Sequence, residues 1–466
     1  MKRLYWEDIK ARIDGATVVQ GDGNPLIDHV VTKRHKIDRH TLLFDLYRKS
    51  EIDRARFRQA ESAVVVTNRP DEFRFAGDSL IVAEVADVDK AYWQFIDYYR
   101  NLFPIPIIGV TGTCGKTTTK EMIKHLLESR YRVQATYKSF NGGHRNHRYL
   151  LGIDDRTGAA VIEMGVDRPG DLKFYIKYFR PGIRILLNID VYHLVGCKTP
   201  ERYFKAKTEI LHDLDPVRDT LIVNADDENI RKIDMSRFQN ILVSFGLTDG
   251  CHFRATDVAY GQGGMRFTLR HRNERHPVFV PGYGTHNVYN ALAAIAAAWS
   301  TGIDIAEACG RMASFRPVAE HLEFRSGIGG CTVIDDTWNV APLSMAAALD
   351  VLRNVAASKT KIAVLGYMPQ LGDGEDARRE YAKIGEKAVE VGVDVLIVVG
   401  DEAKEIGRKA LELGMDPNDV FFCRTGTEVY AILQTFANRD AVVLLKLAHR
   451  VMMEDSFREM KANLIV

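Results

Sequence analysis

The chain has 466 residues, of which 46% are hydrophobic and 27% charged, and its 63 Lys and Arg residues almost balance 62 Asp and Glu residues. This length predicts about three globular domains of roughly 150 residues each, and it excludes a peptide, a disulfide scaffold and a disordered tail. Because the formal net charge is only +1, no general field attracts nucleic acid or an anionic membrane surface, and any anion must be bound locally.

The amino terminus and the apolar runs show no pattern of a targeting or membrane-spanning segment. Residues 1–13 mix charged with apolar side chains, so we expect no secretory signal and a cytoplasmic protein. Apolar runs such as 291–299 and 393–399 fall short of the ~20 residues that a membrane span requires. The 6 cysteines lack a CxxC pair, which is typical of reduced structural thiols rather than of a zinc or redox site.

Two proline-containing seams divide the sequence into three predicted domains. The segments Phe103-Pro-Ile-Pro106 and Phe315-Arg-Pro317 interrupt the alternation of strand-length and helical patterns, since proline fixes an extended backbone. We expect a small amino-terminal α/β domain at 1–103, a central domain at 104–316 and a carboxy-terminal domain at 317–466.

Strand-length apolar runs alternate with helical patterns along the chain, which is typical of βαβ units and mostly parallel sheets. The predicted strands are at 42–46, 62–67, 79–85, 105–110, 158–163, 183–189, 220–223, 331–335, 361–366, 393–400, 419–423 and 441–445. A stretch with β character spans 252–280, and an Ala-rich helix follows at 286–299. The pattern predicts an α/β protein with a central parallel-sheet domain and a Rossmann-like doubly wound sheet in the third domain.

A glycine-rich segment between a predicted strand and a predicted helix indicates a phosphate-binding loop. In Thr111-Gly-Thr-Cys-Gly-Lys-Thr-Thr118, glycine lets backbone N–H groups turn toward an anion, and the helix start adds partial positive charge. Lys116 is placed to reach the β- and γ-phosphates and Thr117 to bind Mg²⁺. The strict motif spacing is not met, because Val110 stands where it requires glycine, but the context favours nucleoside triphosphate binding over a chance Gly-Lys-Thr.

Three polar side chains downstream are candidates for the same site, and each has an ordinary alternative. Glu163 ends an apolar run at the carboxyl end of a strand, where α/β sheets bind ligands and where solvated edge residues are as common. His193 follows another strand, where a loop histidine is more usual than a metal ligand. Lys207 lies on a predicted helix, and its alternative is a surface lysine.

Taken in chain order, these segments resemble the motifs of the Mur ligase family. The matching segments are Thr111-Gly-Thr-Cys-Gly-Lys-Thr-Thr-Thr119, Glu163-Met-Gly165, Asn188 with His193-Leu194, Ala206-Lys207-Thr-Glu-Ile210, His286-Asn-Val-Tyr-Asn-Ala-Leu292 and Ile334-Asp-Asp336. The ordered set is far more specific than any of its members, and it covers residues from 105 to 370 well.

The resemblance implies a three-domain, cytoplasmic ATP-dependent ligase that acts on small molecules and that we expect to be monomeric. A carboxylate attacks the γ-phosphate of ATP, and an amine captures the resulting acyl phosphate, most simply to add a dipeptide or amino acid to a peptidoglycan precursor. ATP and two Mg²⁺ ions are the implied cofactors, and Lys207 matches a lysine that many members carry as a carbamate.

The resemblance also implies roles for individual residues. The implied catalytic residues are Lys116, Glu163, His193, Lys207 and Arg325, and the implied metal site comprises Thr117, Glu163, His193 and Lys207. The implied nucleotide-binding residues are Gly112, Thr113, Cys114, Gly115, Lys116, Thr117 and Thr118, with Asn287 and Asn290 beside the adenine and Asp336 on the ribose.

The segments expected to receive the amine depart from the family pattern. His321 stands where the family has an arginine, for which Arg325 is a candidate substitute. Thr337-Trp-Asn-Val-Ala-Pro342 keeps Asn339 as a substrate-binding candidate and lacks a second asparagine, while Leu365-Gly-Tyr-Met368 and Lys446-Leu-Ala-His-Arg450 are bulkier than their counterparts.

The segments expected to bind the acyl donor also depart. Thr32-Lys-Arg34 stands where members that bind a UDP-sugar have Asp-Ser-Arg, and the glycine-rich segment that follows in those members is absent. The central loop 139–148 matches the family only at Phe140 and Asn141. This loop supplies four further substrate-binding candidates, which are Asn141, His144, Arg145 and Arg148. Its basic side chains would clamp carboxylates or phosphates, and a solvated basic loop is an equal alternative.

Two other functions stay open at this point. One is a ligase of the same family that amidates or cyclises another carboxylate, such as a specialised peptide or a tetrapyrrole. The other is an inactive ATP-binding partner subunit, which the intact Lys116, Glu163, His193 and Lys207 argue against.

Overall fold

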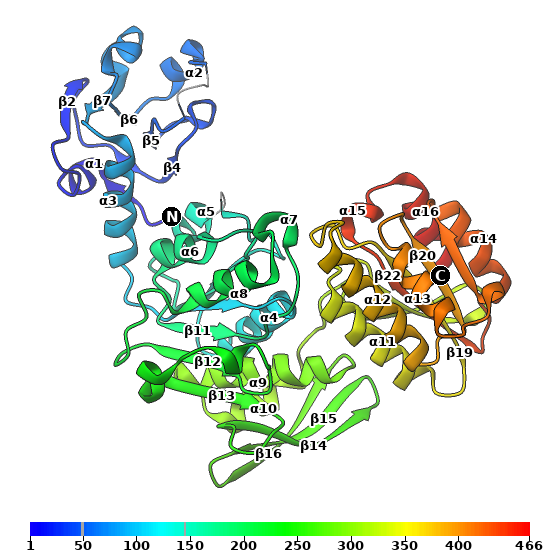
Figure 1. Cartoon of the computed structure of the whole chain (residues 1–466). Coiled ribbons are helices and arrows are strands. Elements are labelled where there is room, and N and C mark those ends of the chain that lie inside the picture. Colours follow the sequence, from blue (N-terminus) through cyan, green and yellow to red (C-terminus); the bar gives the residue numbers. More distant parts are fainter. Residues whose placement is uncertain (48–50, 144–145) are drawn as a thin grey trace. The chain divides into compact units, whose positions relative to one another are not determined.

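The computed structural model describes residues 1–47, 51–143 and 146–466, and it confirms the predicted α/β class (Figure 1). The described strands form sheets of two, five, six and nine strands. Two compact units are present, and the predicted domain boundaries after residues 103 and 316 stay predictions. The first unit is Met1–Ile107, Tyr131–Ala160 and Lys177–Arg180, and the second is Ile108–Arg130, Val161–Ile176 and Pro181–Val466.

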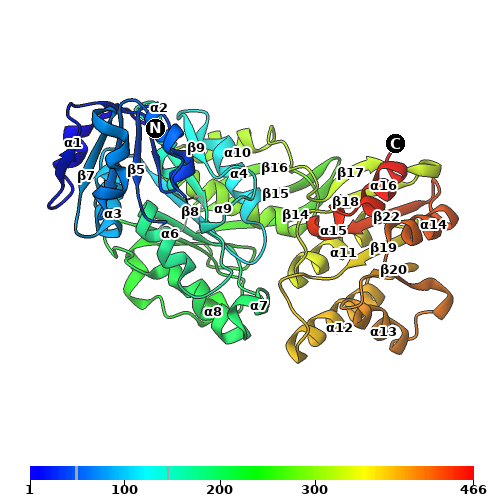
Figure 2. The same cartoon turned by 90° about the horizontal axis from the view of Figure 1, so that it is seen from above.

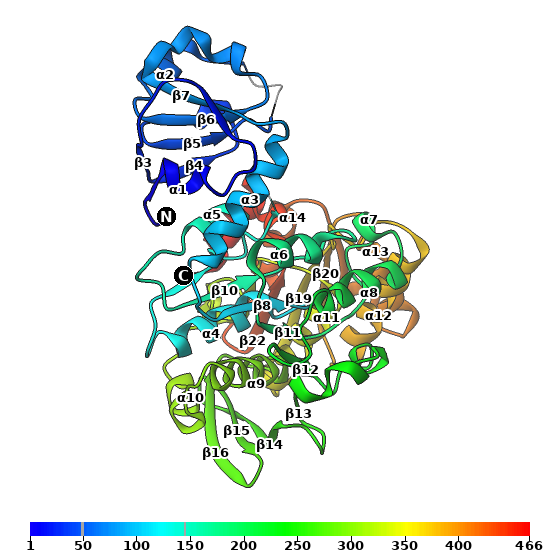
Figure 3. The same cartoon turned by 90° about the vertical axis from the view of Figure 1, so that its left-hand side faces the viewer.

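A five-stranded sheet forms the body of the first unit (Figure 3). Its order is β2-β7-β6-β5-β4, with β4 to β7 parallel and β2 antiparallel to β7. The three strands predicted in this region are confirmed as β5, β6 and β7. The elements are β1 (Leu4–Tyr5), α1 (Trp6–Lys10), β2 (Thr17–Gln20), β3 (Leu26–Ile27), β4 (His29–Val31), β5 (Thr41–Phe44), α2 (Arg54–Gln59), β6 (Ala63–Thr67), β7 (Leu80–Glu84), α3 (Val88–Asn101), β9 (Val133–Ala135) and α5 (Asn146–Leu151).

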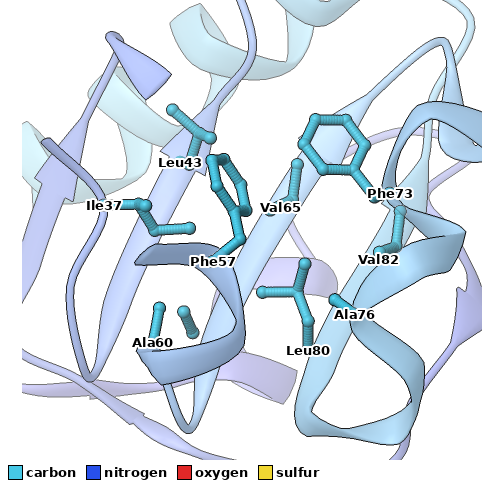
Figure 4. Close-up of a cluster of buried hydrophobic side chains, with 10 residues drawn as sticks. Ile37, Leu43, Phe57, Ala60, Val65, Phe73, Ala76, Leu80 and Val82 are labelled. Carbon is cyan, nitrogen blue, oxygen red and sulfur yellow. The ribbon is translucent and has the colours of Figure 1, made fainter. Parts of the chain in front are cut away.

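One face of this sheet packs against α2 and the short 3₁₀ segment Pro70–Ser79 (Figure 4). Leu43, Val65 and Val82 from three neighbouring strands meet Phe57 and Phe73 in a fully buried cluster. Alternate residues of a strand share a face, so β6 supplies both Ala63 and Val65 to this layer and β7 both Leu80 and Val82.

A buried ion pair lies at the end of β5. Arg34 donates from Nε and Nη2 to the two carboxylate oxygens of Asp45, both at 2.7 Å, and Thr67 Oγ1 donates to Asp45 Oδ2 at 3.2 Å. The side chain of Asp45 is 0% exposed and that of Arg34 is 5% exposed. Arg34, from the segment that departs from the Asp-Ser-Arg pattern, is therefore held within the first unit.

We expect Asp45→Ala to destabilise the first unit by about 3 kcal/mol, because it leaves the buried Arg34 guanidinium without its main partner. The matched control is Glu61→Ala, which breaks the exposed pair with Arg39 and should cost below about 1 kcal/mol. Native-state hydrogen exchange of β5 and β6 measures both. Equal losses in the two variants would contradict the prediction.

The nine-stranded sheet has the order β16-β15-β14-β13-β12-β11-β8-β10-β9. Strands β8, β11, β12, β13 and β14 pair in parallel, and β14, β15 and β16 form an antiparallel ladder that accounts for the predicted β character of 252–280. Its strands are β8 (Ile107–Thr111), β10 (Ala159–Glu163), β11 (Ile183–Leu186), β12 (Thr220–Asn224), β13 (Leu242–Gly246), β14 (Phe253–Gly261), β15 (Gly264–His271) and β16 (Glu274–Pro281). The accompanying helices are α4 (Lys116–Leu127), α6 (Asp171–Phe179), α7 (Leu194–Cys197), α8 (Pro200–Thr208), α9 (Thr285–Ser300) and α10 (Ile305–Met312).

The six-stranded sheet has the order β17-β18-β22-β19-β20-β21 and is parallel except for β17. Right-handed crossovers place α11, α12 and α13 on one face and α14 on the other (Figure 2). This is the doubly wound sheet that the sequence predicts. Its elements are β17 (Glu323–Ser326), β18 (Thr332–Asp336), α11 (Pro342–Ala356), β19 (Thr360–Gly366), α12 (Glu375–Glu390), β20 (Val395–Val399), α13 (Lys404–Glu412), β21 (Val420–Cys423), α14 (Gly426–Phe436), β22 (Ala441–Lys446), α15 (His449–Met452) and α16 (Asp455–Leu464).

In the described part of the chain, the helices are too short or too polar for any of them to cross a membrane.

Candidate functional site

The phosphate loop connects β8 to α4 with the backbone geometry that the sequence predicts. Gly115 has a φ of 81°, in the left-handed region, and α4 begins directly after it. A Cβ at this position would lie 2.4 Å from Asn290 Oδ1, so a larger residue has neither the conformation nor the space. The loop therefore places backbone N–H groups at a helix N-terminus, where anions bind well.

Lys116 lies on this loop without a carboxylate partner in the described residues. Its Nζ donates to the carbonyl oxygens of Gly112 and Thr113, both at 2.9 Å. The ammonium group is therefore held within the loop, where a polyphosphate would meet a positive charge.

Thr117 and Glu163, two residues of the implied metal site, lie in hydrogen-bond contact. Thr117 Oγ1 donates to Glu163 Oε2 at 3.0 Å, and Glu163 ends β10 with only 1% of its surface exposed. This burial excludes the solvated edge residue that was the alternative for Glu163. A hydroxyl and a carboxylate are oxygen donors of the kind that Mg²⁺ prefers. Among the residues that the structure describes, no three His, Cys, Asp or Glu side chains form a ready metal cluster.

Asn188, which follows β11, binds the phosphate loop through hydrogen bonds. Its Oδ1 accepts from the Cys114 backbone N–H at 2.8 Å, and its Nδ2 donates to the Cys114 carbonyl at 3.1 Å. Its own carbonyl accepts from the Thr113 N–H at 3.0 Å. Asn188 thus fixes the phosphate loop. The resemblance includes this residue among the matching segments and assigns it no role.

Lys207 is buried under the loop, with 1% of its surface exposed, which excludes the surface lysine that was its alternative. Its Nζ donates to the Gly112 carbonyl at 2.8 Å and lies 5.2 Å from the centre of the Tyr203 ring. No carboxylate of the described residues lies within ion-pair distance of it. Burial, reinforced by the nearby Lys116 charge, lowers the pKa of Lys207 well below its ordinary value, so its neutral amine is favoured.

His193 occupies a buried position beside Lys207. Its ring stacks on Tyr203 with the centroids 5.8 Å apart, and its backbone is left-handed with a φ of 51°. Nδ1 lies 3.1 Å from Asp167 Oδ1, although the angle is not that of a hydrogen bond. Burial lowers the pKa of His193, opposed by Asp167, which favours the neutral imidazole that binds metal ions.

The two asparagines of α9 are buried and bonded to protein groups. Asn287 Nδ2 donates to the carbonyls of Pro281 and Gly282 at 2.8 and 3.2 Å. Asn290 Oδ1 accepts from Thr119 Oγ1 at 3.2 Å and so ties α9 to the helix of the phosphate loop. Asn287 therefore holds the segment before α9 and Asn290 holds the first turn of α4, and their contact with adenine stays a prediction.

The carboxyl end of β18 and β22 carries the predicted ribose-binding carboxylate. Asp336 is 6% exposed, and its Oδ2 accepts from Lys446 Nζ at 2.6 Å. Lys446 also donates to the carbonyl of Asn339 at 2.8 Å. The side chain of Asn339, a predicted substrate-binding residue, is on the surface.

The bulky substitutions in the segments expected to receive the amine bring three aromatic rings together. The Trp338 ring lies 4.4 Å from His449 and 6.3 Å from His321, measured between centroids. Arg325 stands apart on β17 with 51% of its side chain exposed, paired to Glu323 at 2.7 Å. Its predicted catalytic role stays a prediction.

The predicted donor-binding loop is described only in part. His144 and Arg145 lie outside the described residues. Arg148 is exposed on α5, and Asn141 is partly buried before it. Both belong to the first unit, and their substrate contacts stay predictions.

Sequence reasoning missed Tyr203, Asp167 and the pairing role of Lys446. Tyr203 and Lys207 are four residues apart on α8, and helical residues at this spacing share a face, so the signal was available. Asp167 and Lys446 pair with His193 and Asp336, which lie far from them in the sequence, so local residue spacing does not indicate these pairs.

Two family models match the central and the carboxy-terminal parts of the chain. The model of the Mur ligase middle domain matches residues 110–298, and that of the Mur ligase glutamate ligase domain matches residues 322–447. The UDP-N-acetylmuramoyl-tripeptide–D-alanyl-D-alanine ligase of Bacillus subtilis is 29% identical over 360 residues, which are 75% of this chain and 76% of that protein. The enzyme of the same name from Mycobacterium leprae is 32% identical over 320 residues, which are 64% and 61% of the two chains.

Solved structures show the same fold. MurF from Acinetobacter baumannii superposes with a TM-score of 0.81 at 23% identity and covers 99% of this chain and 100% of its own. MurF ligase from Thermotoga maritima, solved in complex with ADP, gives a TM-score of 0.75 at 20% identity and covers 93% and 97%. At these identities the likeness is one of fold.

Proposed function

The chain belongs to the Mur ligase family, and on that premise we propose that it joins a carboxylate to an amine with ATP, most simply to add a dipeptide to a peptidoglycan precursor. It is an ATP-dependent ligase, as the sequence predicts. The proposed acyl donor is a UDP-N-acetylmuramoyl-tripeptide and the proposed acceptor is D-alanyl-D-alanine, the substrates in the names of its relatives. We further propose a cytoplasmic, monomeric enzyme.

The observation that carries the proposal is the convergence of Lys116, Glu163 and Lys207 on one phosphate loop. Lys116 and Lys207 both donate to the Gly112 carbonyl, and Glu163 accepts from the loop hydroxyl of Thr117. These residues come from three separate segments of the chain. Their arrangement provides positive charge for a polyphosphate beside oxygen donors, as carboxylate activation by ATP requires.

In the proposed reaction the substrate carboxylate attacks the γ-phosphorus of ATP, ADP leaves, and an acyl phosphate forms. The amine nitrogen then attacks the acyl carbon, phosphate leaves, and the amine loses a proton. Lys116 neutralises charge on the transferred phosphoryl group, and the loop N–H groups bind the other phosphates. Asn188 keeps the loop in this shape through its bonds to Cys114, and the Tyr203 hydroxyl lies 3.2 Å from Thr113 Oγ1 of the same loop.

The residues present fit Mg²⁺, because Thr117 and Glu163 are oxygen donors 3.0 Å apart and His193 is favoured in its neutral form. Thr117 would hold one ion with the phosphates, and Glu163 and His193 would hold a second. When bound, the ions reduce the repulsion between the substrate carboxylate and the triphosphate.

Carbamylation of Lys207 is part of the proposal. A neutral amine is the form that adds carbon dioxide, and the lowered pKa of Lys207 supplies it. The carbamate would place an anion beside Lys116, at a position where Lys207 has no carboxylate partner in the described residues. This anion would attract the Lys116 ammonium and provide a further oxygen donor for Mg²⁺.

The decisive experiment measures phosphate release by the full-length protein with ATP, Mg²⁺, UDP-N-acetylmuramoyl-tripeptide and D-alanyl-D-alanine. We expect release that requires both substrates and a product heavier by the dipeptide residue, measured by mass spectrometry. Phosphate release that occurs only with other carboxylates would favour a ligase of this family that serves another pathway. The altered acceptor segments around Trp338 and His449 support this alternative. Nucleotide binding without turnover on any carboxylate would favour the inactive subunit.

A further inference from the structure

Two lysines from distant parts of the chain pair with aspartates at the carboxyl end of β18. In the parallel pairing of β18 with β22, Asp336 lies directly opposite Lys446, so the register itself brings this pair together. The neighbouring Asp335 pairs with Lys461 of α16 at 2.8 Å. Each aspartate thus has its own ammonium partner.

The Asp336–Lys446 pair is almost fully buried, with side-chain exposures of 8% and 2%. Lys446 Nζ holds Asp336 Oδ2 at 2.6 Å and is anchored at 2.8 Å to the Asn339 carbonyl. In the described part of the chain, Oδ1 of Asp336 has no protein partner. One carboxylate oxygen is therefore fixed while the other is available to accept hydrogen bonds from a ligand.

A carboxylate held in this way is well suited to recognise hydroxyl groups. Its rotation is blocked by the lysine, so no ordering of the side chain is required when a ligand binds. The Lys446 ammonium is the ion-pair partner of this carboxylate, and hydrogen bonds to a charged acceptor are the stronger ones.

We propose that Lys446 is a positioning residue that fixes Asp336 for the ribose hydroxyls and so makes the site selective for ribonucleotides. This inference rests on the proposed function, which supplies the assignment of Asp336 to the ribose. It goes further by giving a specificity role to a lysine that acts through Asp336.

The test compares the binding of ADP and 2′,3′-dideoxy-ADP to the full-length protein by isothermal titration calorimetry. We expect the unchanged protein to prefer ADP about 30-fold, as is typical for hydroxyl groups bonded to a charged acceptor. In Lys446→Met the preference should fall below about 3-fold, while the affinity for 2′,3′-dideoxy-ADP changes less than about twofold. Asp336→Asn should lose the preference to a similar degree.

Lys461→Met is the matched control, because it also removes a partly buried ammonium from an aspartate on β18. It leaves the Asp336–Lys446 pair intact and should keep the preference for ADP. Should Lys446→Met fail to fold, the double variant Lys446→Met, Asp336→Asn removes both charges. Its loss of preference should equal that of Asp336→Asn alone.

An unchanged preference in Lys446→Met would overturn the inference, as would additive losses in the double variant or a loss in Lys461→Met. Equal binding of both nucleotides by the unchanged protein would also overturn it and leave the ligase proposal standing. Failure of the unchanged protein to bind ADP at all would instead defeat the proposed function.

Discussion

Replacing Lys116 by methionine should reduce ATP-dependent phosphate release on the order of 10³-fold, because it removes the positive charge placed against the transferred phosphoryl group. The fold should survive the change. Lys116 Nζ donates to two loop carbonyls, of which that of Gly112 also accepts from Lys207, and in the described residues Lys116 is paired with no carboxylate. The thermal midpoint should therefore stay close to that of the unchanged protein.

The matched control for this prediction is Lys124→Met on the same helix. Lys124 is partly exposed, and its 3.7 Å pair with Glu128 is weak, so both phosphate release and stability should be unchanged. Phosphate release is measured with the proposed acyl donor and acceptor. Undiminished release in Lys116→Met would contradict the ligase mechanism.

Replacing Lys207 by methionine should abolish most of the activity while making the fold more stable near neutral pH. The activity should fall on the order of 10²- to 10³-fold, because groups that bind a catalytic metal ion or orient its ligands contribute on this scale. If the carbamate is what the site needs, a short carboxylic acid such as formate should restore part of the activity. Wild-type activity in Lys207→Met would contradict the proposed role.

The stability change has a sign that follows from the lowered pKa of Lys207. The unfolded chain binds a proton on this lysine up to a pH of about 10.4, whereas the native state releases it at lower pH. The unfolded state thus binds more protons, so the stability of the uncarbamylated protein rises with pH in this window. Methionine removes this dependence.

Urea unfolding in bicarbonate-free buffer at pH 7 and pH 9 measures the change. Lys207→Met should exceed the unchanged protein in stability at pH 7 by more than at pH 9. Lys205→Met on the exposed face of α8 should alter neither stability nor activity. A variant less stable than the unchanged protein at both pH values would show that the amine is not a destabilising buried charge.

The strands that the sequence predicted best are the ones buried on both faces. The runs at β8, β11 and β12 are continuous and apolar, because helices or other layers cover both sides of a parallel sheet. β13 was missed, since its half-exposed residues Leu242–Gly246 interrupt the apolar pattern with Ser244. Short strands such as β9 and β17 lie at sheet edges and carry too few apolar residues to be recognised.

By itself the sequence determined the family, the α/β class and the phosphate loop, because each depends on residue types at fixed local spacing. Thr111–Thr118 must bend where glycine stands, and Lys116 and Thr117 must begin the helix that follows. The role of a candidate with a common alternative, such as Glu163 or Lys207, was left open because spacing does not report burial.

Only the tertiary structure decided which charges are buried and which pair with each other. Burial turned Lys207 from an ordinary cation into an amine with a lowered pKa, and the register of β18 with β22 joined Asp336 to Lys446 across 110 residues. The same holds for Arg34 and Asp45 in the first unit. The physical reason is that desolvation and ion pairing depend on neighbours in space, which the packing of distant segments brings together.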